Sequence, residues 1–211
     1  TFIAKNRVFA AKQIDKMPEE KLIIMDDGMQ NPSLVKDFSI LVVDGGYGFG
    51  NNLILPAGPL RQSVESAREN VDLVIIVGKD KFGIADLFKS KKVISCKSKP
   101  TNIDKFKKKN LIAFCGIGRP LKFFESLDDA GLKVRKRLSY SDHYKYKEKD
   151  IAKLLDIAQK HDATLITTKK DWVRLSDENR KKVDYLDIKV EFNAKDQKFI
   201  KNKLKDIIGD V

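Results

Sequence analysis

The carboxylates of Asp26 and Asp27 are the side chains with the clearest potential for chemistry. They directly follow an apolar run, residues 22–25, which is typical of a short buried strand. Many nucleotide-handling enzymes hold Mg²⁺ beside phosphate groups with carboxylates at the carboxyl end of a strand. The alternative is an ordinary turn, because Asp27-Gly28 is a common turn dipeptide. Gln30 adds a neutral donor near the same point and leaves both interpretations open.

A glycine-rich loop, residues 45–50, follows a second apolar run that ends in Asp44. Its backbone N–H groups could cradle phosphate, but it lacks the G-x-x-x-x-G-K-[ST] spacing of a phosphate loop. Pro56 and Pro59 exclude a helix that starts directly behind it. We interpret residues 45–50 as a shaped loop near a site and not as the nucleotide cradle.

The segment from Gly116 to Pro120 joins an apolar run to a predicted helix. The backbone amides of Gly116 and Gly118 would then face the position where an anion binds, and Arg119 could add a charge-assisted contact. An ordinary tight connection between a strand and a helix explains the same residues.

Asp142 and His143 are adjacent in the segment 139–144. A carboxylate beside an imidazole can fix the tautomer of the ring and favour proton transfer near neutral pH. Adjacent residues on a loop need not touch, however, and a single surface histidine is usually inert. Thr168 is a plausible helix cap, and Lys170 or Asp171 could reach a site at the strand ends, although a structural role is the simpler interpretation.

Short apolar runs alternate with helical patterns along the chain, which predicts an α/β fold with a doubly wound sheet. The predicted strands are continuously apolar and fit parallel strands covered on both faces. They span residues 22–25, 40–43, 73–77, 111–115, 132–138, 164–167 and 188–192. The predicted helices span residues 7–14, 60–70, 120–130, 148–160, 170–175 and 194–208.

We expect two lobes separated by a basic junction. Apolar periodicity lapses between residues 89 and 110, where lysines, serines and Pro100 dominate. The predicted organisation is a first lobe at 1–88 that carries the acidic motif, a junction at 89–110 and a self-contained α/β lobe at 111–211.

Composition narrows the range of functions. The 42 basic and 30 acidic residues give 42 − 30 = +12, mostly as lysine spread along the chain. The densest lysine run lacks the interleaved aromatic residues of single-strand binders, so we expect no nucleic-acid partner. Cys96 and Cys115 form no disulfide or metal pattern, which favours a cytoplasmic setting. No apolar run is long enough for a membrane span, and no secretory signal is visible.

Taken together, the motifs resemble the tetraacyldisaccharide 4′-kinase family of lipid A kinases. The acidic motif of that family matches at Asp26, Asp27, Gly28, Gln30, Leu34, Asp37 and Asp44, and departs at Met29, Asn31 and Lys36. Four further blocks follow in the family's order: residues 49–51 with 55–61, 116–120 with 123–124, 142–143, and 167–175 with Lys169 in place of a glutamate. Tyr144 and Lys145 replace the usual residues after the Asp-His pair, and Arg7 with residues 10–11 fits the segment before the acidic motif.

The resemblance implies a P-loop-NTPase-like first lobe and transfer of the ATP γ-phosphoryl group to the 4′-hydroxyl of tetraacyldisaccharide 1-phosphate, giving lipid IVA. Asp26 and Asp27 would then be the Mg²⁺-side carboxylates, Asp142 and His143 would assist the attacking hydroxyl, and Gln30, Gly116, Gly118 and Arg119 would bind ATP. The family works on the cytoplasmic face of the inner membrane, so basic surface facing anionic lipid gives the +12 charge a second explanation.

The resemblance also implies that a membrane helix, a Gly-Lys-Thr phosphate loop and a catalytic acidic residue precede Thr1. Because such a loop supplies much of the charge stabilisation in phosphoryl transfer, we expect this chain alone to be inactive unless a separate polypeptide carries the loop. Two other functions stay open. One is a non-catalytic module that binds anionic lipid, and the other is an unrelated nucleotide-binding protein.

Overall fold

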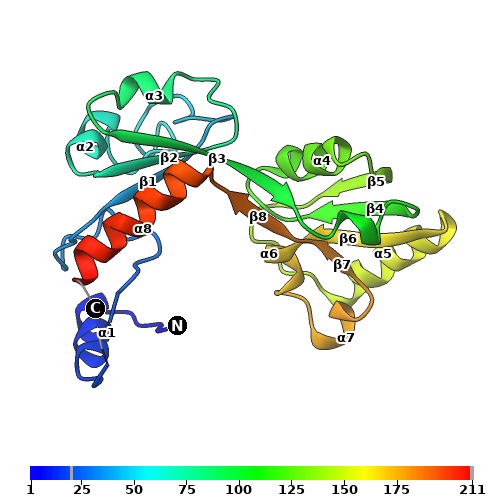
Figure 1. The fold of residues 1–211 in the computed structure, drawn as a ribbon. Coiled ribbons are helices and arrows are strands. Elements are labelled where there is room, and N and C mark those ends of the chain that lie inside the picture. The colour runs from blue at the N-terminus through cyan, green and yellow to red at the C-terminus, as the bar shows by residue number, and fades with distance from the viewer. Residues whose placement is uncertain (20, 210–211) are drawn as a thin grey trace. The chain divides into compact units, whose positions relative to one another are not determined.

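The computed structural model describes residues 1–19 and 21–209, which divide into two compact units. The first unit consists of residues 1–97 and 190–211, and the second is Ser98–Lys189. The chain passes from the first unit to the second within strand β3 (Lys92–Pro100) and returns within β8 (Ile188–Glu191) (Figure 1).

The first unit is built on a four-stranded sheet in the order β1-β2-β3-β8. Strands β1 (Ile40–Asp44) and β2 (Leu73–Val77) are parallel, with Ile40 opposite Leu73, and β2 and β3 are parallel as well. The helices of this unit are α1 (Arg7–Asp15), α2 (Val64–Glu69), α3 (Ile84–Leu87) and α8 (Ala194–Ile208).

Strand β2 is the centre of the first unit, because it is buried over most of its length. On one face Val74 and Ile76 pack with Ile84 and Phe88 from α3 and its end. On the other face Leu73, Ile75, Ile94 and Cys96 are covered by Phe199 and Ile200 of α8. Helix α8 therefore completes the core of the first unit, although it comes last in the sequence (Figure 1).

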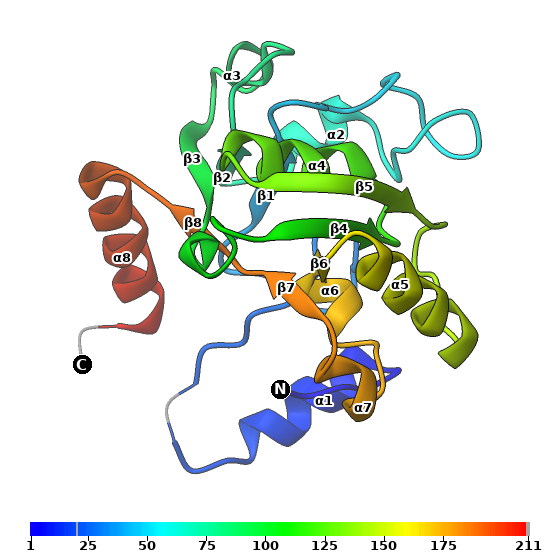
Figure 2. The same ribbon diagram turned by 90° about the vertical axis from the view of Figure 1, so that its right-hand side faces the viewer.

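The second unit contains a parallel four-stranded sheet in the order β5-β4-β6-β7. Its strands are β4 (Asn110–Cys115), β5 (Lys133–Ser139), β6 (Ala163–Thr168) and β7 (Asp184–Leu186). Its helices are η1 (Ile103–Lys105), α4 (Pro120–Asp129), α5 (Glu148–Lys160), α6 (Lys169–Trp172) and α7 (Asp177–Arg180). Helices α4 and α5 cover opposite faces of the sheet and enclose two apolar clusters (Figure 2).

Local sequence signals explain the helices of the second unit. Pro120 occupies the first turn of α4, where no backbone N–H is needed, and Gly131 ends that segment with φ of 68°. Helix α5 buries Ile151, Leu154 and Ala158, which recur at helical spacing on one face. These elements agree with the predicted ranges 120–130 and 148–160.

The predicted strand at residues 22–25 is wrong. These residues have no strand conformation, and Leu22, Ile23 and Ile24 are exposed. An apolar run becomes a strand only where a neighbour pairs with its backbone. In the first sheet β1 pairs with β2, and residues 22–25 join no strand in the described ranges. Asp26 and Asp27 therefore lie in a turn and do not end a strand.

The predicted helix at 60–70 begins later, at Val64, because Ser63 caps it by accepting a hydrogen bond from the Ser66 N–H. The expected junction at 89–110 is also different. Residues 92–100 form β3, in which buried Ile94 and Cys96 alternate with exposed Ser95 and Lys97. Elements at β7, α3, α7 and η1 were not predicted.

The boundaries of the two units differ from the expected lobes 1–88 and 111–211. Strand β3 belongs to the first sheet because it pairs with β2, and α8 belongs to the first unit because Phe199 and Ile200 pack on that sheet. The longest helix, α8, has 15 residues, and within the described ranges none of the helices combines the length and the apolar character of a membrane span.

Candidate functional site

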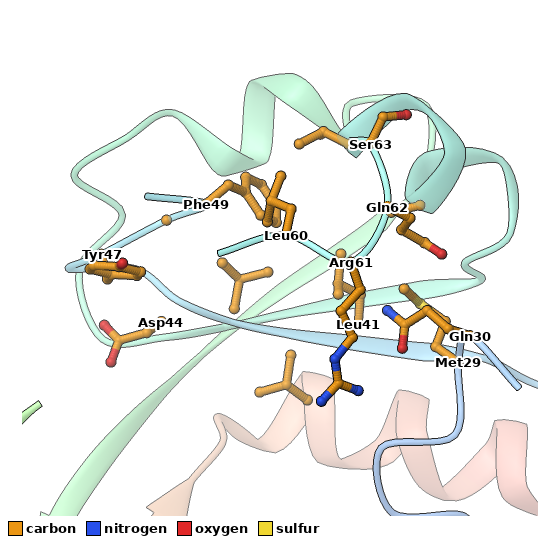
Figure 3. A pocket seen from close by; sticks show the side chains of 15 residues that line it. Met29, Gln30, Leu41, Asp44, Tyr47, Phe49, Leu60, Arg61, Gln62 and Ser63 are labelled. Atoms are coloured by element: carbon orange, nitrogen blue, oxygen red, sulfur yellow. The ribbon is translucent and has the colours of Figure 1, made fainter. Parts of the chain in front are cut away.

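A hollow of about 300 Å³ lies at the carboxyl end of β1 in the first unit (Figure 3). The end of β1, the glycine loop, the segment before α2 and the turn after Asp27 contribute its walls. The polar and aromatic side chains that line it are Gln30, Asp44, Tyr47, Phe49, Arg61, Gln62 and Ser63. The Nε2 of Gln62 is buried and has no hydrogen-bond partner among the described residues.

The glycine loop after β1 is held tightly. Asp44 Oδ1 accepts a hydrogen bond of 2.9 Å from the Gly46 N–H, which closes the turn. A Cβ atom at Gly45 would lie 2.6 Å from the Lys79 carbonyl oxygen, so only glycine fits at this close approach. The loop is a shaped wall of the hollow, as expected from the missing phosphate-loop spacing.

The segment from Asn51 to Arg61 is rigid for a loop. The Asn51 side chain donates to the Ala57 carbonyl at 2.9 Å, and the Leu55 N–H donates to the Leu60 carbonyl at 2.8 Å. These contacts hold Arg61 at a fixed end of the segment. The planar fork of a guanidinium matches a carboxylate, so an arginine loses less side-chain entropy per hydrogen bond formed than a lysine does.

Arg61 is the partner of Asp27. Its Nη1 lies 2.7 Å from Asp27 Oδ2, in an ion pair that is open to solvent. Arg7 also donates to the backbone carbonyls of Asp26 and Asp27, at 3.4 Å each. Asp27 has a positive φ of 52°, which an aspartate tolerates in a turn. The turn is thus fixed by two arginines that are far away in sequence.

The carboxylates of this turn fit a metal ion only in part. Within the described residues, no group of three or more His, Cys, Asp or Glu side chains is arranged to hold a metal ion. Mg²⁺ in nucleotide sites often takes only one or two protein carboxylates, with phosphate and water oxygens as its other ligands. Asp26 is exposed and suits that role, whereas the carboxylate of Asp27 is paired with Arg61.

The second unit gathers a separate polar cluster at the carboxyl ends of β4 and β6. Asp171 is fully buried, and its Oδ2 accepts hydrogen bonds from the Gly116 N–H at 3.0 Å and the Thr168 hydroxyl at 2.8 Å. Thr168 also caps α6 as predicted, since its hydroxyl accepts from the Asp171 N–H. The buried carboxylate therefore ties the Gly116 loop to the start of α6.

Arg174 connects this buried carboxylate to His143. Its Nη1 lies 3.3 Å from Asp171 Oδ1 and donates to the Gly116 carbonyl at 3.4 Å, while its Nη2 lies 3.2 Å from His143 Nδ1. The Arg174 side chain is 27% exposed and that of His143 is 79% exposed. The cluster thus runs from a buried carboxylate to an exposed imidazole.

Asp142 and His143 form a tight turn after β5. The His143 N–H donates to Asp142 Oδ1 at 2.9 Å and to the Gly116 carbonyl at 3.0 Å, and His143 has a positive φ of 57°. The Asp142 carboxylate lies 3.9 Å from His143 Nε2, which is beyond hydrogen-bond distance. The two residues are held together by the hydrogen bond from the His143 backbone to the Asp142 carboxylate and not by a bond between their side chains.

Cys115 lies beside this cluster and is fully buried. Burial, together with the negative charge of Asp171, raises the pKa of the Cys115 thiol to about 12. The thiol is therefore neutral near pH 7 and acts as a small core residue, as the sequence indicated.

The structure brings the predicted site residues into two groups. Asp26, Asp27 and Gln30 lie in the first unit, and Gly116, Gly118, Arg119, Asp142 and His143 lie in the second. Gly118 approaches the Asp142 carboxylate so closely that a Cβ atom there would lie 3.3 Å from Oδ2. The sequence suggested only that Lys170 or Asp171 could reach a site at the strand ends, and it assigned no role to Arg174 or Arg61.

The fold is of a known class. A crystal structure of LpxK from Aquifex aeolicus in complex with ATP aligns with a TM-score of 0.62 at 23% identity, over 86% of this chain and 56% of that one. The chain thus shares the α/β fold of that structure.

Sequence comparison then identifies the family. The family model described as tetraacyldisaccharide-1-P 4'-kinase matches residues 1–208, and the chain belongs to that family.

Individual proteins of similar sequence carry the same description as the family model. A tetraacyldisaccharide 4'-kinase of Rhodospirillum rubrum is 42% identical over 177 residues, which is 81% of this chain and 54% of the relative. Those of Paramagnetospirillum magneticum and Rickettsia akari are 38% and 40% identical, over 92% and 83% of this chain and 60% and 54% of the relatives. The chain therefore spans little more than half the length of these curated relatives.

Proposed function

We propose that this chain forms part of an ATP-dependent lipid kinase that phosphorylates the 4′-hydroxyl of tetraacyldisaccharide 1-phosphate to give lipid IVA. Family membership over residues 1–208 is the observation that carries the proposal. The arrangement of the motifs supports it, because hydrogen bonds hold each of them in a defined turn.

Each predicted residue has a role in this proposal. Asp26, in an exposed turn, would hold Mg²⁺, and Asp27 with its partner Arg61 sets the position of that turn. Bound Mg²⁺ would neutralise phosphate charge. Gln30 lines the hollow beside β1 and donates a hydrogen bond to the nucleotide.

The second unit contributes the remaining groups. Gly118 and Arg119 directly precede α4, where backbone N–H groups favour a phosphate, while the Gly116 N–H is already donated to Asp171 and fixes the loop. Asp142 and His143 assist the attacking hydroxyl, and their fixed backbone provides the positioning that phosphoryl transfer requires.

The proposed kinase acts at the cytoplasmic face of the inner membrane, where its lipid acceptor is found. An exposed stripe on α8 supports contact with anionic lipid. It consists of Lys198, Lys201 and Lys205, which make no ion pair among the described residues. They lie on the side of α8 opposite Phe199 and Ile200, which pack on the sheet. Lysines held near an anionic bilayer each contribute about 1 kcal/mol to binding.

The proposal is tested with a fusion kinase, in which this chain replaces the matched region of the Rhodospirillum rubrum relative. We expect the fusion kinase to convert tetraacyldisaccharide 1-phosphate in the presence of ATP and Mg²⁺. The measurement is the formation of radiolabelled lipid from ATP labelled in its γ-phosphate. Asp26→Asn should lower kcat by at least about a hundredfold, because a Mg²⁺ contact stabilises the transferring phosphoryl group.

The isolated chain and the exposed control Asp177→Asn are assayed beside these variants. Asp177 pairs with Arg180 on the surface of the second unit, so its loss should leave conversion unchanged. A well-folded fusion kinase without ATP-dependent conversion would contradict the proposed function. Equal activity of Asp26→Asn and the parent would contradict the metal role alone.

A further inference from the structure

Arg174 determines which nitrogen of the His143 ring carries the proton. A guanidinium group is always charged and can only donate hydrogen bonds. Its Nη2 lies 3.2 Å from His143 Nδ1, so Nδ1 must be the acceptor. The neutral ring then carries its proton on Nε2, because the acceptor nitrogen has none.

Arg174 is itself held on the side away from His143. Its Nη1 contacts both the carboxylate of Asp171 and the Gly116 carbonyl. Asp171 has no solvent exposure and is fixed by the Gly116 N–H and the Thr168 hydroxyl. A charged pair of this kind is costly to break, because the buried carboxylate would lose its partner. The guanidinium is therefore preorganised to cap Nδ1.

The opposite side of the ring is open. His143 Nε2 has no hydrogen-bond partner among the described residues, and the ring is largely exposed. Asp142 Oδ1 lies 3.9 Å from Nε2. Two groups that each contact one shared oxygen at about 2.8 Å are separated by roughly this distance. The Nε2–H can donate to such an oxygen while the Asp142 carboxylate accepts from it, and a hydroxyl group satisfies both.

We propose that Asp171 and Arg174 are positioning residues that present His143 to the substrate as an Nε2–H donor and not as a base. His143 and Asp142 then hold the accepting hydroxyl group between them. The ring cannot take the proton of that hydroxyl, because its one lone pair is bound to Arg174. This assignment rests on the proposed kinase function for its substrate, but the contact between Arg174 and His143 is testable without it.

The first test measures acylation of the two histidines by diethyl pyrocarbonate, which attacks the unprotonated nitrogen of neutral imidazole. His143 and His161 are the only histidines of the chain, so mass spectrometry separates them and His161 is an internal reference. In the wild-type chain we expect His143 to react more slowly than His161, although both are exposed. Arg174→Met should raise the His143 rate about fivefold, since a charged hydrogen bond near solvent is lost.

Arg174→Lys is the conservative variant and should keep part of the protection, because an ammonium group also only donates. Circular dichroism and the His161 rate report on folding. Equal rates of His143 and His161 in the wild-type chain would overturn the proposal, whether or not the variants fold. It would also be overturned if Arg174→Met left the His143 rate unchanged.

The second test uses the fusion kinase and compares two replacements of His143. Glutamine retains a side-chain N–H donor, and alanine has none. If His143 donates, His143→Gln should keep kcat within about tenfold of the parent, while His143→Ala should lose about a hundredfold, as for other donors to a reacting oxygen. Equal losses in both variants would contradict the donor role.

The two tests can fail separately. An inactive fusion kinase contradicts the proposed function, while the acylation rates still decide whether Arg174 caps His143. Changes in the KM for ATP and in the KM for the lipid acceptor in the His143 variants show which substrate contacts the imidazole ring. A rise in KM for ATP alone would overturn the assignment of the hydroxyl group as the ligand.

Discussion

At the scale of single residues, Asp171 has the largest structural role in the second unit. Its buried carboxylate makes three contacts, with the Gly116 N–H, the Thr168 hydroxyl and the Arg174 guanidinium. The sequence predicted the cap at Thr168, but burial of an aspartate leaves no periodic signal. The roles of Asp171 and Arg174 therefore became visible only when β4 and β6 were placed side by side.

Asp171→Asn should destabilise the chain by about 2 kcal/mol, because hydrogen bonds to a buried charged group are lost and Arg174 is left unpaired. Urea unfolding followed by circular dichroism measures this change. The matched control is Asp177→Asn, since that side chain is 91% exposed and its ion pair should contribute less than about 0.5 kcal/mol. Equal midpoints for the two variants would contradict the role given to Asp171.

Cys115 should resist alkylation in the native chain at pH 8. Its pKa is raised to about 12, so the reactive thiolate forms only when the pH approaches that value. We expect iodoacetamide to label neither Cys115 nor buried Cys96 in folded protein and both in urea. Fast labelling of Cys115 before unfolding, read by mass spectrometry, is the opposite outcome.

The sign of this pH effect follows from linkage. The thiol has a higher pKa in the folded chain than its ordinary value of 9.0, so the folded state binds its proton more tightly. The resulting contribution to stability is complete below pH 9 and is lost as the pH rises toward 12. Acid conditions leave it unchanged.

At the scale of elements, the sequence predicted those whose pattern is local. Helix α5 and β2 agree with the predicted ranges because apolar residues recur at the spacing of one helical face or form one buried run. Strand β3 was not predicted because several lysines interrupt its sequence. The alternation of buried and exposed residues that is typical of a strand is visible only at Ile94 and Cys96. Residues 22–25 show the reverse error, since an apolar run without a pairing neighbour forms no strand.

Helix α8 is the element whose outer face we expect to contact anionic lipid. Replacing Lys198, Lys201 and Lys205 with Gln should reduce partition onto phosphatidylglycerol-containing vesicles, by about 1 kcal/mol per lysine at low salt. Sedimentation with vesicles, with and without phosphatidylglycerol, measures the loss.

The control for α8 removes the same charge from the second unit, at Lys145, Lys149 and Lys153, which are exposed on and before α5. It should bind vesicles almost as the parent does. Equal loss in both triple variants would mean that net charge, and not α8, governs binding. Binding to RNA instead of vesicles would contradict the lipid assignment.

At the scale of the whole molecule, each apolar cluster lies within one of the two units. Both clusters of the second unit draw only on residues between Ser98 and Lys189, with Phe106, Phe114 and Leu154 among the most deeply buried. Both clusters of the first unit draw on residues outside that range, including Phe199 of α8. Each unit thus has a core of its own.

The fragment 98–189 should therefore fold without the rest of the chain. We expect cooperative urea unfolding and dispersed amide signals in its NMR spectrum. The fragment 1–97 should not fold in the same way, because Leu73, Ile75 and Ile94 lose their cover from α8. A disordered 98–189 fragment, or an ordered 1–97 fragment, would contradict this division.

The site shows the limit of sequence reasoning at this scale. Each motif was recognised from local residue types, but the partners that fix it come from distant positions, as with Arg61 for Asp27 and Arg174 for His143. Such pairs depend on how loops meet after folding. The motifs can therefore be recognised in a single sequence, but the distant residues that contact them cannot.

The chain leaves the first unit in β3 and re-enters it in β8, and these strands are neighbours in one sheet. The second unit is thus an insertion at a hairpin position, so its loss requires only that a short turn joins the two strands. A miniature protein of residues 1–97 and 190–211 with such a turn retains both apolar clusters of its sheet. Shuffling of the inserted unit between homologues should accordingly leave the host sheet intact.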